Sequence, residues 1–229
     1  MASTISKARK VQYDKFWDGS ARPNWDLEKV TITAEAFLPK RSLSGAREIP
    51  RGEMEHPTLA TAIVLPVTTT GRPSPPDPES GLALKAYAYD RGHLIGLELG
   101  GPDVSMNIAP QWAHFQRTQL WRKMERSVRD LALAVMGIKT VPAASSWAKM
   151  VTAPTYVVTI AVTLIYGREP MVPNKFRVVL KKLRMADLTF VQFGAEAVSA
   201  NGALDITFEL DNEPDPRDLR TTEKQEEKM

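Results

Sequence analysis

The chain has 229 residues, enough for one sizeable domain, and 43% of them are hydrophobic. It contains no cysteine, which excludes disulfides and thiolate metal sites, so any metal must be bound by nitrogen and oxygen ligands. The net charge of +3 is too small to indicate a nucleic-acid partner by itself. No apolar run approaches the ~20 residues of a membrane span, and the N-terminus lacks the apolar core of a signal peptide. We therefore expect a soluble protein without a membrane partner, cytoplasmic as made, with export by a route that needs no cleaved signal left open.

Most of the predicted elements are short β-branched runs separated by glycine and proline. In chain order, strands are predicted over 29–37, 58–69, 82–97 (a pair), 155–166, 175–183, 188–193 and 204–210. Residues 71–80 contain four prolines and are expected to form an extended surface loop. Residues 1–28 are expected to be an N-terminal extension packed on the domain, 29–210 the domain itself, and 211–229 a disordered tail.

The longest helical pattern runs from about residue 115 to residue 135. Three- and four-residue spacing predicts an apolar stripe of Leu120, Met124, Val128, Leu131 and Val135. A neighbouring face carries the charged residues Arg122, Glu125, Arg126 and Arg129. An ordinary helix face with ion pairs is the competing interpretation of these charges. One long helix among about six strands predicts an α+β fold with a mixed or antiparallel sheet.

Asp90-Arg91-Gly92-His93 stands at the end of an alternating, strand-like run. A histidine there can act as a general base near neutral pH, because its ordinary pKa is about 6.5. Arg91 beside it has a planar, permanently charged guanidinium that suits phosphate, and Gly92 leaves room for a ligand to approach the backbone. Glu98 is the nearest following carboxylate and could orient the imidazole or contact a metal. The competing interpretation is a surface histidine with salt-bridged neighbours.

A second group of motifs follows at short range: Asn107-Ile108-Ala109-Pro110-Gln111, then Phe115-Gln116, then Trp121-Arg122-Lys123-Met124-Glu125, on a segment that opens the long helix. Together with DRGH, this order resembles the DNA/RNA non-specific endonucleases of the ββα-metal class. Their pattern is DRGH, an Asn-Ile-x-Pro-Gln run, an asparagine, and then Trp and Glu on one helix. The resemblance covers residues 87–130, with a weaker part up to about 184. Four separated matches in order are more specific than one short motif.

The resemblance implies a metal-dependent endonuclease with a ββα-metal motif and little sequence specificity. It assigns catalytic roles to His93 as general base, Arg91, Asn107 and Glu125, and phosphate binding to Arg122 and Arg129. Arg91 would also contact phosphate, Asn107 would fix the loop or His93, and Glu125 would orient water at the metal. The implied cofactor is one Mg²⁺ or Mn²⁺ ion per active site, and the implied substrate is DNA, RNA or both.

The family's metal-binding asparagine stands four residues before the tryptophan, where this chain has Arg117. Aligned from the phenylalanine, Gln116 takes that place and is predicted to be the sole direct protein ligand of the metal. Gln116 and Glu125 are nine residues apart, about 900° on a regular helix, which would place them on opposite faces. We therefore expect a non-helical or distorted helix start at Gln116. The rival ligands are Gln119 and His114.

Two other classes of function stay open. A catalytically weakened nuclease fold would bind nucleic acid without cleaving it. The presence of Gln116 in the place of the family's metal-binding asparagine favours that alternative. A protein-interaction module would use residues 71–80 and the tail, and would show no salt-sensitive DNA binding. Some nucleases of the resembled family are delivered bacterial toxins with a dedicated inhibitor. A toxin role with an inhibitor (immunity) protein as partner is therefore left open beside a housekeeping role.

Overall fold

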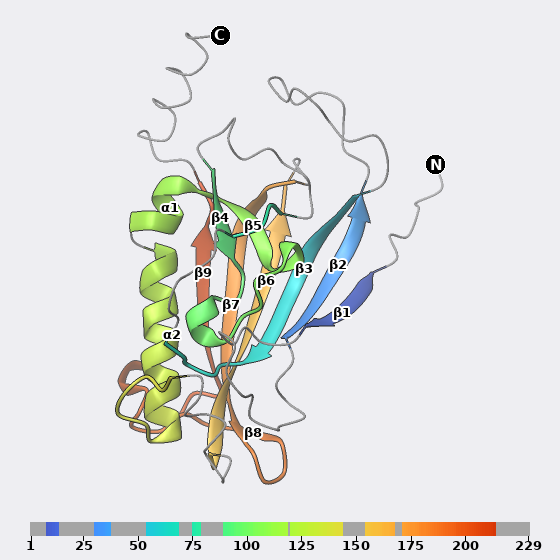
Figure 1. The fold of residues 1–229 in the computed structure, drawn as a ribbon. Coiled ribbons are helices and arrows are strands. Elements are labelled where there is room, and N and C mark those ends of the chain that lie inside the picture. The colour runs from blue at the N-terminus through green and yellow to red at the C-terminus, as the bar shows by residue number, and fades with distance from the viewer. Residues whose placement is uncertain are drawn as a thin grey trace, which may run out of the picture.

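The computed structural model describes residues 8–13, 30–37, 54–68, 75–78, 89–118, 120–143, 154–167 and 171–213, without the side chains of His114, Arg117 and Thr118. These residues form a seven-stranded sheet, a two-stranded sheet and two α-helices (Figure 1). The large sheet consists of β1 (Arg9–Tyr13), β2 (Val30–Phe37), β3 (Met54–Ile63), β6 (Tyr156–Tyr166), β7 (Pro173–Arg184), β8 (Thr189–Val191) and β9 (Asp205–Asp211). All of its strand pairs are antiparallel, so the predicted α+β class is confirmed.

The large sheet has the order β1-β2-β3-β6-β7. On the side of β7 away from β6, β8 pairs with one part of β7 and β9 with another. Residues 182–184 of β7 pair with β8, and residues 175–181 pair with β9. The β6–β7 pair is the longest and runs from Tyr156 opposite Arg184 to Tyr166 opposite Pro173. Because β6 carries no charged side chain and is rich in β-branched residues, it suits the middle of a sheet.

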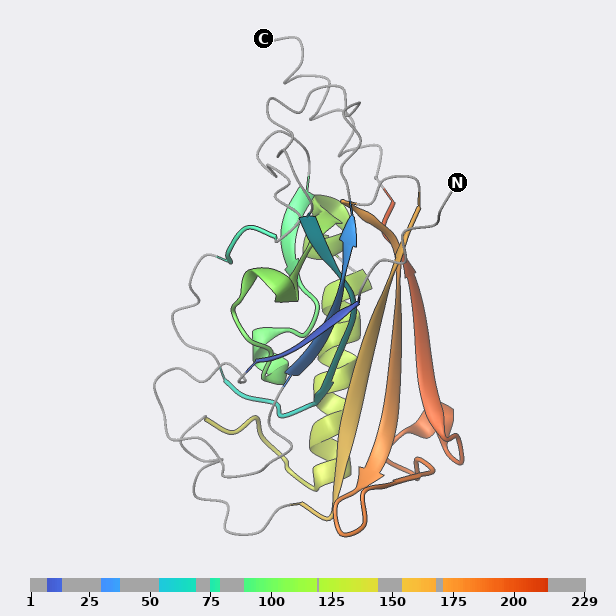
Figure 2. The same cartoon turned by 90° about the vertical axis from the view of Figure 1, so that its right-hand side faces the viewer.

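The core lies between the large sheet and α2 (Leu120–Met136), which runs along one face of the sheet (Figure 2). Phe176 of β7 packs against both helices. Its ring centroid lies 5.9 Å from that of Phe115 in α1 and 5.0 Å from that of Trp121 in α2. The buried residues of α2 are Trp121, Met124, Val128, Ala132 and Leu133. The prediction that Leu120 starts the apolar stripe is wrong, since Leu120 is exposed. Trp121 takes the buried position at this end of the helix and buries a larger apolar surface there.

The two-stranded sheet pairs β4 (Tyr89–His93) with β5 (Ile108–Trp112), so that His93 lies opposite Ile108. Between these strands lie two short 3-10 helices, η2 (Leu97–Leu99) and η3 (Ser105–Asn107), and α1 (Ala113–Thr118) and α2 follow β5. The resulting order is strand, strand, helix. The helical pattern is predicted from about residue 115, and residues 108–112 before it form a strand that was not predicted from the sequence. Pro110 lacks the backbone N–H that a helix interior needs, and Ile108 is β-branched, so both favour a strand.

Other boundaries differ by a few residues from the predicted ones. β3 begins at Met54 and ends at Ile63, before Pro66. Within the expected N-terminal extension, β1 pairs with β2. β9 ends at Asp211, and Asn212 after it is buried, so folded structure continues past residue 210. Residues 81–88 and 214–229 lie outside the described residues, as does the loop at 71–80 apart from 75–78. No described helix is long and apolar enough to cross a membrane.

Candidate active site

His93 is the last residue of β4, and its imidazole is paired with a carboxylate. Its Nε2 lies 2.9 Å from Oδ1 of Asp103, and the two side chains are only 12% and 15% exposed. Asp103 follows Gly100-Gly101-Pro102, in which Gly100 has a φ of 88° and ends η2. Asp103 was not predicted as a site residue. The signal that could have found it is this Gly-Gly-Pro turn, which reverses the chain toward the end of β4.

Asn107 is fully buried and binds two separate stretches of backbone through its side chain. Its Nδ2 donates to the carbonyls of Ile95 at 2.9 Å and Pro102 at 2.8 Å, and its Oδ1 accepts from the Ile95 N–H at 3.1 Å. Asn107 therefore joins the segment that follows His93 to the loop that carries Asp103. An amide suits this position because it donates and accepts at the same time.

Glu125 of α2 lies against the segment that follows His93. A Cβ placed on Gly96 would be 2.5 Å from Oε1 of Glu125, so the carboxylate lies directly over this glycine. One turn further along α2, Nη1 of Arg129 lies 4.0 Å from Oε2 of Glu98. η2 and its preceding residues thus cross the face of α2 that carries Glu125 and Arg129. Glu98, the nearest carboxylate after His93 in the sequence, lies beside Arg129 of α2, and Asp103 contacts the imidazole instead.

The predicted phosphate-binding arginines lie in different surroundings. Nη1 of Arg91 donates to the Pro75 carbonyl at 2.6 Å, and Nη2 forms a 2.9 Å ion pair with Asp77. A phosphate at Arg91 would therefore compete with the Asp77 carboxylate. Arg129 binds the neighbouring Asp130 at 2.9 Å and is 29% exposed. Arg122 is exposed in the first turn of α2.

Gln116 is half-buried and is the fourth residue of α1, a helix separate from α2. Gln116 lies in helical backbone, so the prediction of a non-helical position for it is wrong; α1 ends at Thr118 and α2 begins at Leu120. Residue 119 and the side chain of His114, the rival ligands, lie outside the described residues. Because α1 and α2 are separate helices, the count of nine residues along one regular helix does not fix the angle between Gln116 and Glu125.

Gln111 of β5 is fully buried beside the DRGH motif. A Cβ placed on Gly92 would lie 2.1 Å from the carboxamide carbon of Gln111, so the amide packs against the glycine backbone. The space at Gly92 was expected to admit a ligand, but the structure fills it with this side chain. Neither amide atom of Gln111 has a hydrogen-bond partner among the described residues. A buried amide without a partner costs about 1–3 kcal/mol, so the position is unusual.

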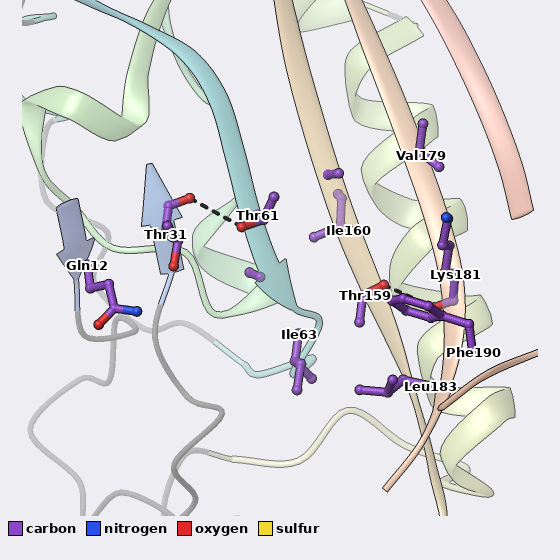
Figure 3. Close-up of a pocket in the computed structure, with 12 residues that line it drawn as sticks. Gln12, Thr31, Thr61, Ile63, Thr159, Ile160, Val179, Lys181, Leu183 and Phe190 are labelled. Atoms are coloured by element: carbon purple, nitrogen blue, oxygen red, sulfur yellow. Dashed lines mark hydrogen bonds between the residues drawn. The ribbon is translucent and has the colours of Figure 1, made fainter. Parts of the chain in front are cut away.

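A pocket of about 490 Å³ lies elsewhere, on the large sheet (Figure 3). Its lining includes Thr31, Thr61, Thr159, Val179, Lys181 and Phe190. Hydrogen bonds from Thr61 to the Thr31 carbonyl and from Thr159 to the Lys181 carbonyl hold part of this lining in place. None of the predicted site residues is among the described residues that line the pocket, and Lys181 is the one ionisable side chain among those residues.

Comparison with known proteins places the same segment in a nuclease context. Residues 74–142 match the family model described as DNA/RNA non-specific endonuclease. Among solved structures, an "extracellular nuclease" is 16% identical with a TM-score of 0.39, covering 69% of this chain and 78% of its own. An "extracellular endonuclease" is 12% identical with a TM-score of 0.41 and 94% of both chains covered. A structure of the Sda1 nuclease with a bound zinc ion is 12% identical with a TM-score of 0.41, and the match covers 92% of this chain and 85% of the Sda1 chain. No curated protein matches.

The family match contains the whole run from β4 to the end of α2, and with it His93, Asn107, Glu125 and Arg129. It confirms the resemblance that the DRGH motif and the following motifs indicate. This ββα segment is therefore similar to the DNA/RNA non-specific endonucleases, which supports an endonuclease function with nucleic acid as the substrate.

Proposed function

We propose that the chain is a metal-dependent endonuclease that hydrolyses phosphodiester bonds of DNA, RNA or both with little sequence preference, with His93 as its general base. One observation carries the proposal. The imidazole of His93 is held at the end of β4, and the next residues lie against Glu125 and Arg129 of α2. A base, a second carboxylate and a phosphate-binding cation are the groups that such a hydrolysis needs close together.

The types of donor that the chain offers suit a hard cation that keeps most of its own water. With no cysteine in the chain, only oxygen and nitrogen ligands are available. The described residues contain no group of three or more His, Asp and Glu side chains that could hold a metal. Mg²⁺ and Mn²⁺ suit such a donor set, since Mg²⁺ is commonly bound by one or two protein oxygens together with substrate phosphates. Gln116 would supply the protein ligand.

Each residue has a separate part in the proposed reaction. His93 takes a proton from the attacking water, and Glu125 hydrogen-bonds and orients water near the phosphate. Arg91, Arg122 and Arg129 bind phosphate oxygens and offset their charge. When bound, the cation supplies Lewis-acid stabilisation of the charge that develops on the phosphate. Asn107 holds the backbone on which His93 depends.

His93→Ala tests the general base. We expect the folded variant to cleave plasmid DNA on the order of 10²–10⁴ times more slowly, the usual effect of removing a general base. EDTA should stop cleavage by the wild type, and added Mg²⁺ or Mn²⁺ should restore it. Wild-type cleavage by the folded variant would exclude His93 as the base, and cleavage in EDTA would exclude the metal.

Gln116→Ala tests the metal ligand, with Gln119→Ala as the matched control. We expect Gln116→Ala to need a higher Mg²⁺ concentration for half-maximal cleavage, and Gln119→Ala to keep the wild-type dependence. An unchanged Mg²⁺ dependence in Gln116→Ala would move the assignment to Gln119 or His114.

A fold that binds nucleic acid without cleaving it is the second candidate, favoured by Gln116 in the place of the family's asparagine. It predicts salt-sensitive binding of a short duplex without nicking of plasmid DNA at any Mg²⁺ or Mn²⁺ concentration. A toxin role has its own test. Expression of the wild type, but not of His93→Ala, would then arrest bacterial growth, and a co-expressed inhibitor protein would relieve the arrest.

A further inference from the structure

The pairing of His93 with Asp103 is as close as the Arg91–Asp77 and Arg129–Asp130 ion pairs, at 2.9 Å, and it is better sheltered from solvent. The 2.9 Å distance between Nε2 and Oδ1 is that of a good hydrogen bond, and both side chains are largely buried. By contrast, the Asp77 carboxylate that pairs with Arg91 is 71% exposed. Solvent weakens exposed ion pairs, whereas the His93–Asp103 hydrogen bond is largely sheltered from it.

The backbone around Asp103 is fixed on both sides by one residue. The Pro102 carbonyl accepts a hydrogen bond from Nδ2 of Asn107, and the Val104 carbonyl accepts one from the Asn107 N–H at 2.9 Å. Gly101 adds a close approach, because a Cβ there would lie 1.8 Å from the Ile95 carbonyl oxygen. The Asp103 carboxylate is therefore held in place, as a group that orients another side chain must be.

We propose that Asp103 is the positioning residue of the general base: it accepts a hydrogen bond from Nε2–H of His93 and so makes Nδ1 the nitrogen that takes the proton from water. The proposal rests on the function proposed above. An ionised carboxylate can only accept a hydrogen bond, so its partner Nε2 must carry the proton. In neutral imidazole the other nitrogen is then the acceptor. The negative charge of Asp103 also stabilises the imidazolium that forms when His93 accepts a proton.

The electrostatic role is separable from a merely structural one. Asn at position 103 has a similar shape and keeps an acceptor oxygen, so it can still tie the loop to His93. It lacks the negative charge and would leave the imidazolium less stabilised. Other charged groups lie on the elements around His93, namely Asp90 and Arg91 with Asp77, Glu98, Glu125 and Arg129. They are unchanged in the variant, so any change in the titration of His93 is due to residue 103.

The experiment compares Asp103→Asn and Asp103→Glu with the wild type, using single-turnover cleavage of a short DNA duplex in Mg²⁺ from pH 5 to pH 9. Cleavage needs neutral His93, so the rate rises with pH through the pKa of this residue. Loss of the neighbouring negative charge lowers that pKa, and the rise should move to lower pH by about one unit in Asp103→Asn. The plateau rate should fall on the order of 10²-fold, because the base is weaker and less well oriented. Asp103→Glu keeps the charge and should recover part of the rate.

Two further arms keep the interpretation unambiguous. Asp187→Asn changes an aspartate of the β7–β8 turn, which binds Arg184 and Thr189 away from the site, and should leave the pH profile unchanged. His93→Ala, run in parallel, tests the proposed function itself. A wild-type rate in His93→Ala overturns that function, whereas an inactive His93→Ala with a wild-type profile in Asp103→Asn overturns only the role of Asp103.

A direct measurement on the wild type does not depend on whether a variant folds. Nitrogen-15 NMR of the imidazoles, with His93 assigned by comparison with His93→Ala, reports which ring nitrogen carries the proton. The expected result near pH 8 is a protonated Nε2 and a bare Nδ1 in His93. The opposite tautomer would overturn the proposal.

Discussion

The large sheet and the β4–β5 unit share one apolar core but differ in their buried polar contacts. The large sheet and α2 bury a continuous apolar core that includes Val30, Ile160, Val178 and Phe176. The β4–β5 unit has only five residues in each strand, and an isolated two-stranded sheet is marginal in water. Ala109 of β5 and the intervening residues Leu94, Ile95, Leu99 and Met106 belong to the same core, and buried side-chain amides give the unit further support. Of the four buried polar or charged residues described, three lie in or bind to this unit, namely Asn107, Gln111 and Asn212.

Asn212 shows how the two regions are joined. Its Nδ2 donates to the carbonyls of Pro110 at 3.2 Å and Pro173 at 2.7 Å, and its Oδ1 accepts from the Trp112 N–H at 3.0 Å. Apolar burial has no direction, whereas a buried amide fixes particular backbone groups in particular places. Changes in the large sheet should therefore lower stability, and changes in the amides should also displace the site.

The largest effect is expected for Asn107→Ala. The change leaves the N–H and carbonyl of Ile95 and the carbonyl of Pro102 without their partner. We expect a loss of about 3–5 kcal/mol in unfolding free energy, together with cleavage by the folded fraction reduced by at least tenfold. Denaturant unfolding and cleavage rates measure the two effects. Asn201→Ala, at an exposed asparagine, is the control, and a wild-type cleavage rate in folded Asn107→Ala would refute the positioning role of this amide.

Ile160→Ala makes the corresponding change in the large sheet. Ile160 lies in the middle of β6 and is 1% exposed, so its truncation leaves a cavity. We expect a loss of about 2–5 kcal/mol in unfolding free energy, with cleavage per folded molecule within about twofold of the wild type. Ile165→Ala on the same strand, at a 38% exposed position, should cost much less. If cleavage by folded Ile160→Ala fell as much as cleavage by Asn107→Ala, the large sheet would affect the site as strongly as the buried amides do, which contradicts the prediction.

Gly92→Ala tests the packing of Gln111 against Gly92 within the β4–β5 unit. The new Cβ would collide with the Gln111 carboxamide, and we expect a loss of about 1–3 kcal/mol. Gln111→Ala removes the colliding group, so the double variant should be more stable than the sum of the single changes by about 0.5–3 kcal/mol. Thermal unfolding of the four proteins in the cycle measures this coupling. Strict additivity would show that the two residues do not meet.

The smallest effect is expected at Glu196, next to the large sheet. Burial alone would raise the pKa of this carboxyl, but hydrogen bonds from Lys182 and from the Gly194 N–H lower it below its ordinary value. The ionised form therefore stabilises the fold above the unfolded pKa of about 4.3, and this contribution is lost as the pH falls through the lower folded pKa. Glu196→Gln should cost about 0.5–1 kcal/mol at pH 7, and the difference from the wild type should vanish in acid.

Unfolding curves from pH 7 down to pH 3 measure this prediction. Glu209→Gln is the control, because Glu209 pairs with Arg177 on the exposed surface, where solvent weakens the interaction. A pH-independent difference between Glu196→Gln and the wild type would mean that the charge of Glu196 does not contribute.

The sequence by itself determined what depends on local periodicity. β2, β6, β7 and β9 follow β-branched runs, α2 follows an apolar stripe, and DRGH with the motifs after it identifies the candidate site. The strand and helix signals each lie within about 20 residues of chain, where the geometry of a helix or strand dictates which side chains share a face. The motif series is longer and runs from Asp90 to Glu125.

Only the tertiary structure decided the contacts between segments. Asp103 reaches His93 because the Gly-Gly-Pro turn reverses the chain and Asn107 fixes both sides of it, and no periodicity encodes that path. Gln111 fills the space at Gly92 because β5 pairs with β4, a strand pairing that the helical pattern after it obscured. Loop paths depend on directional hydrogen bonds to residues elsewhere in the fold, and they exist only once those residues have come together.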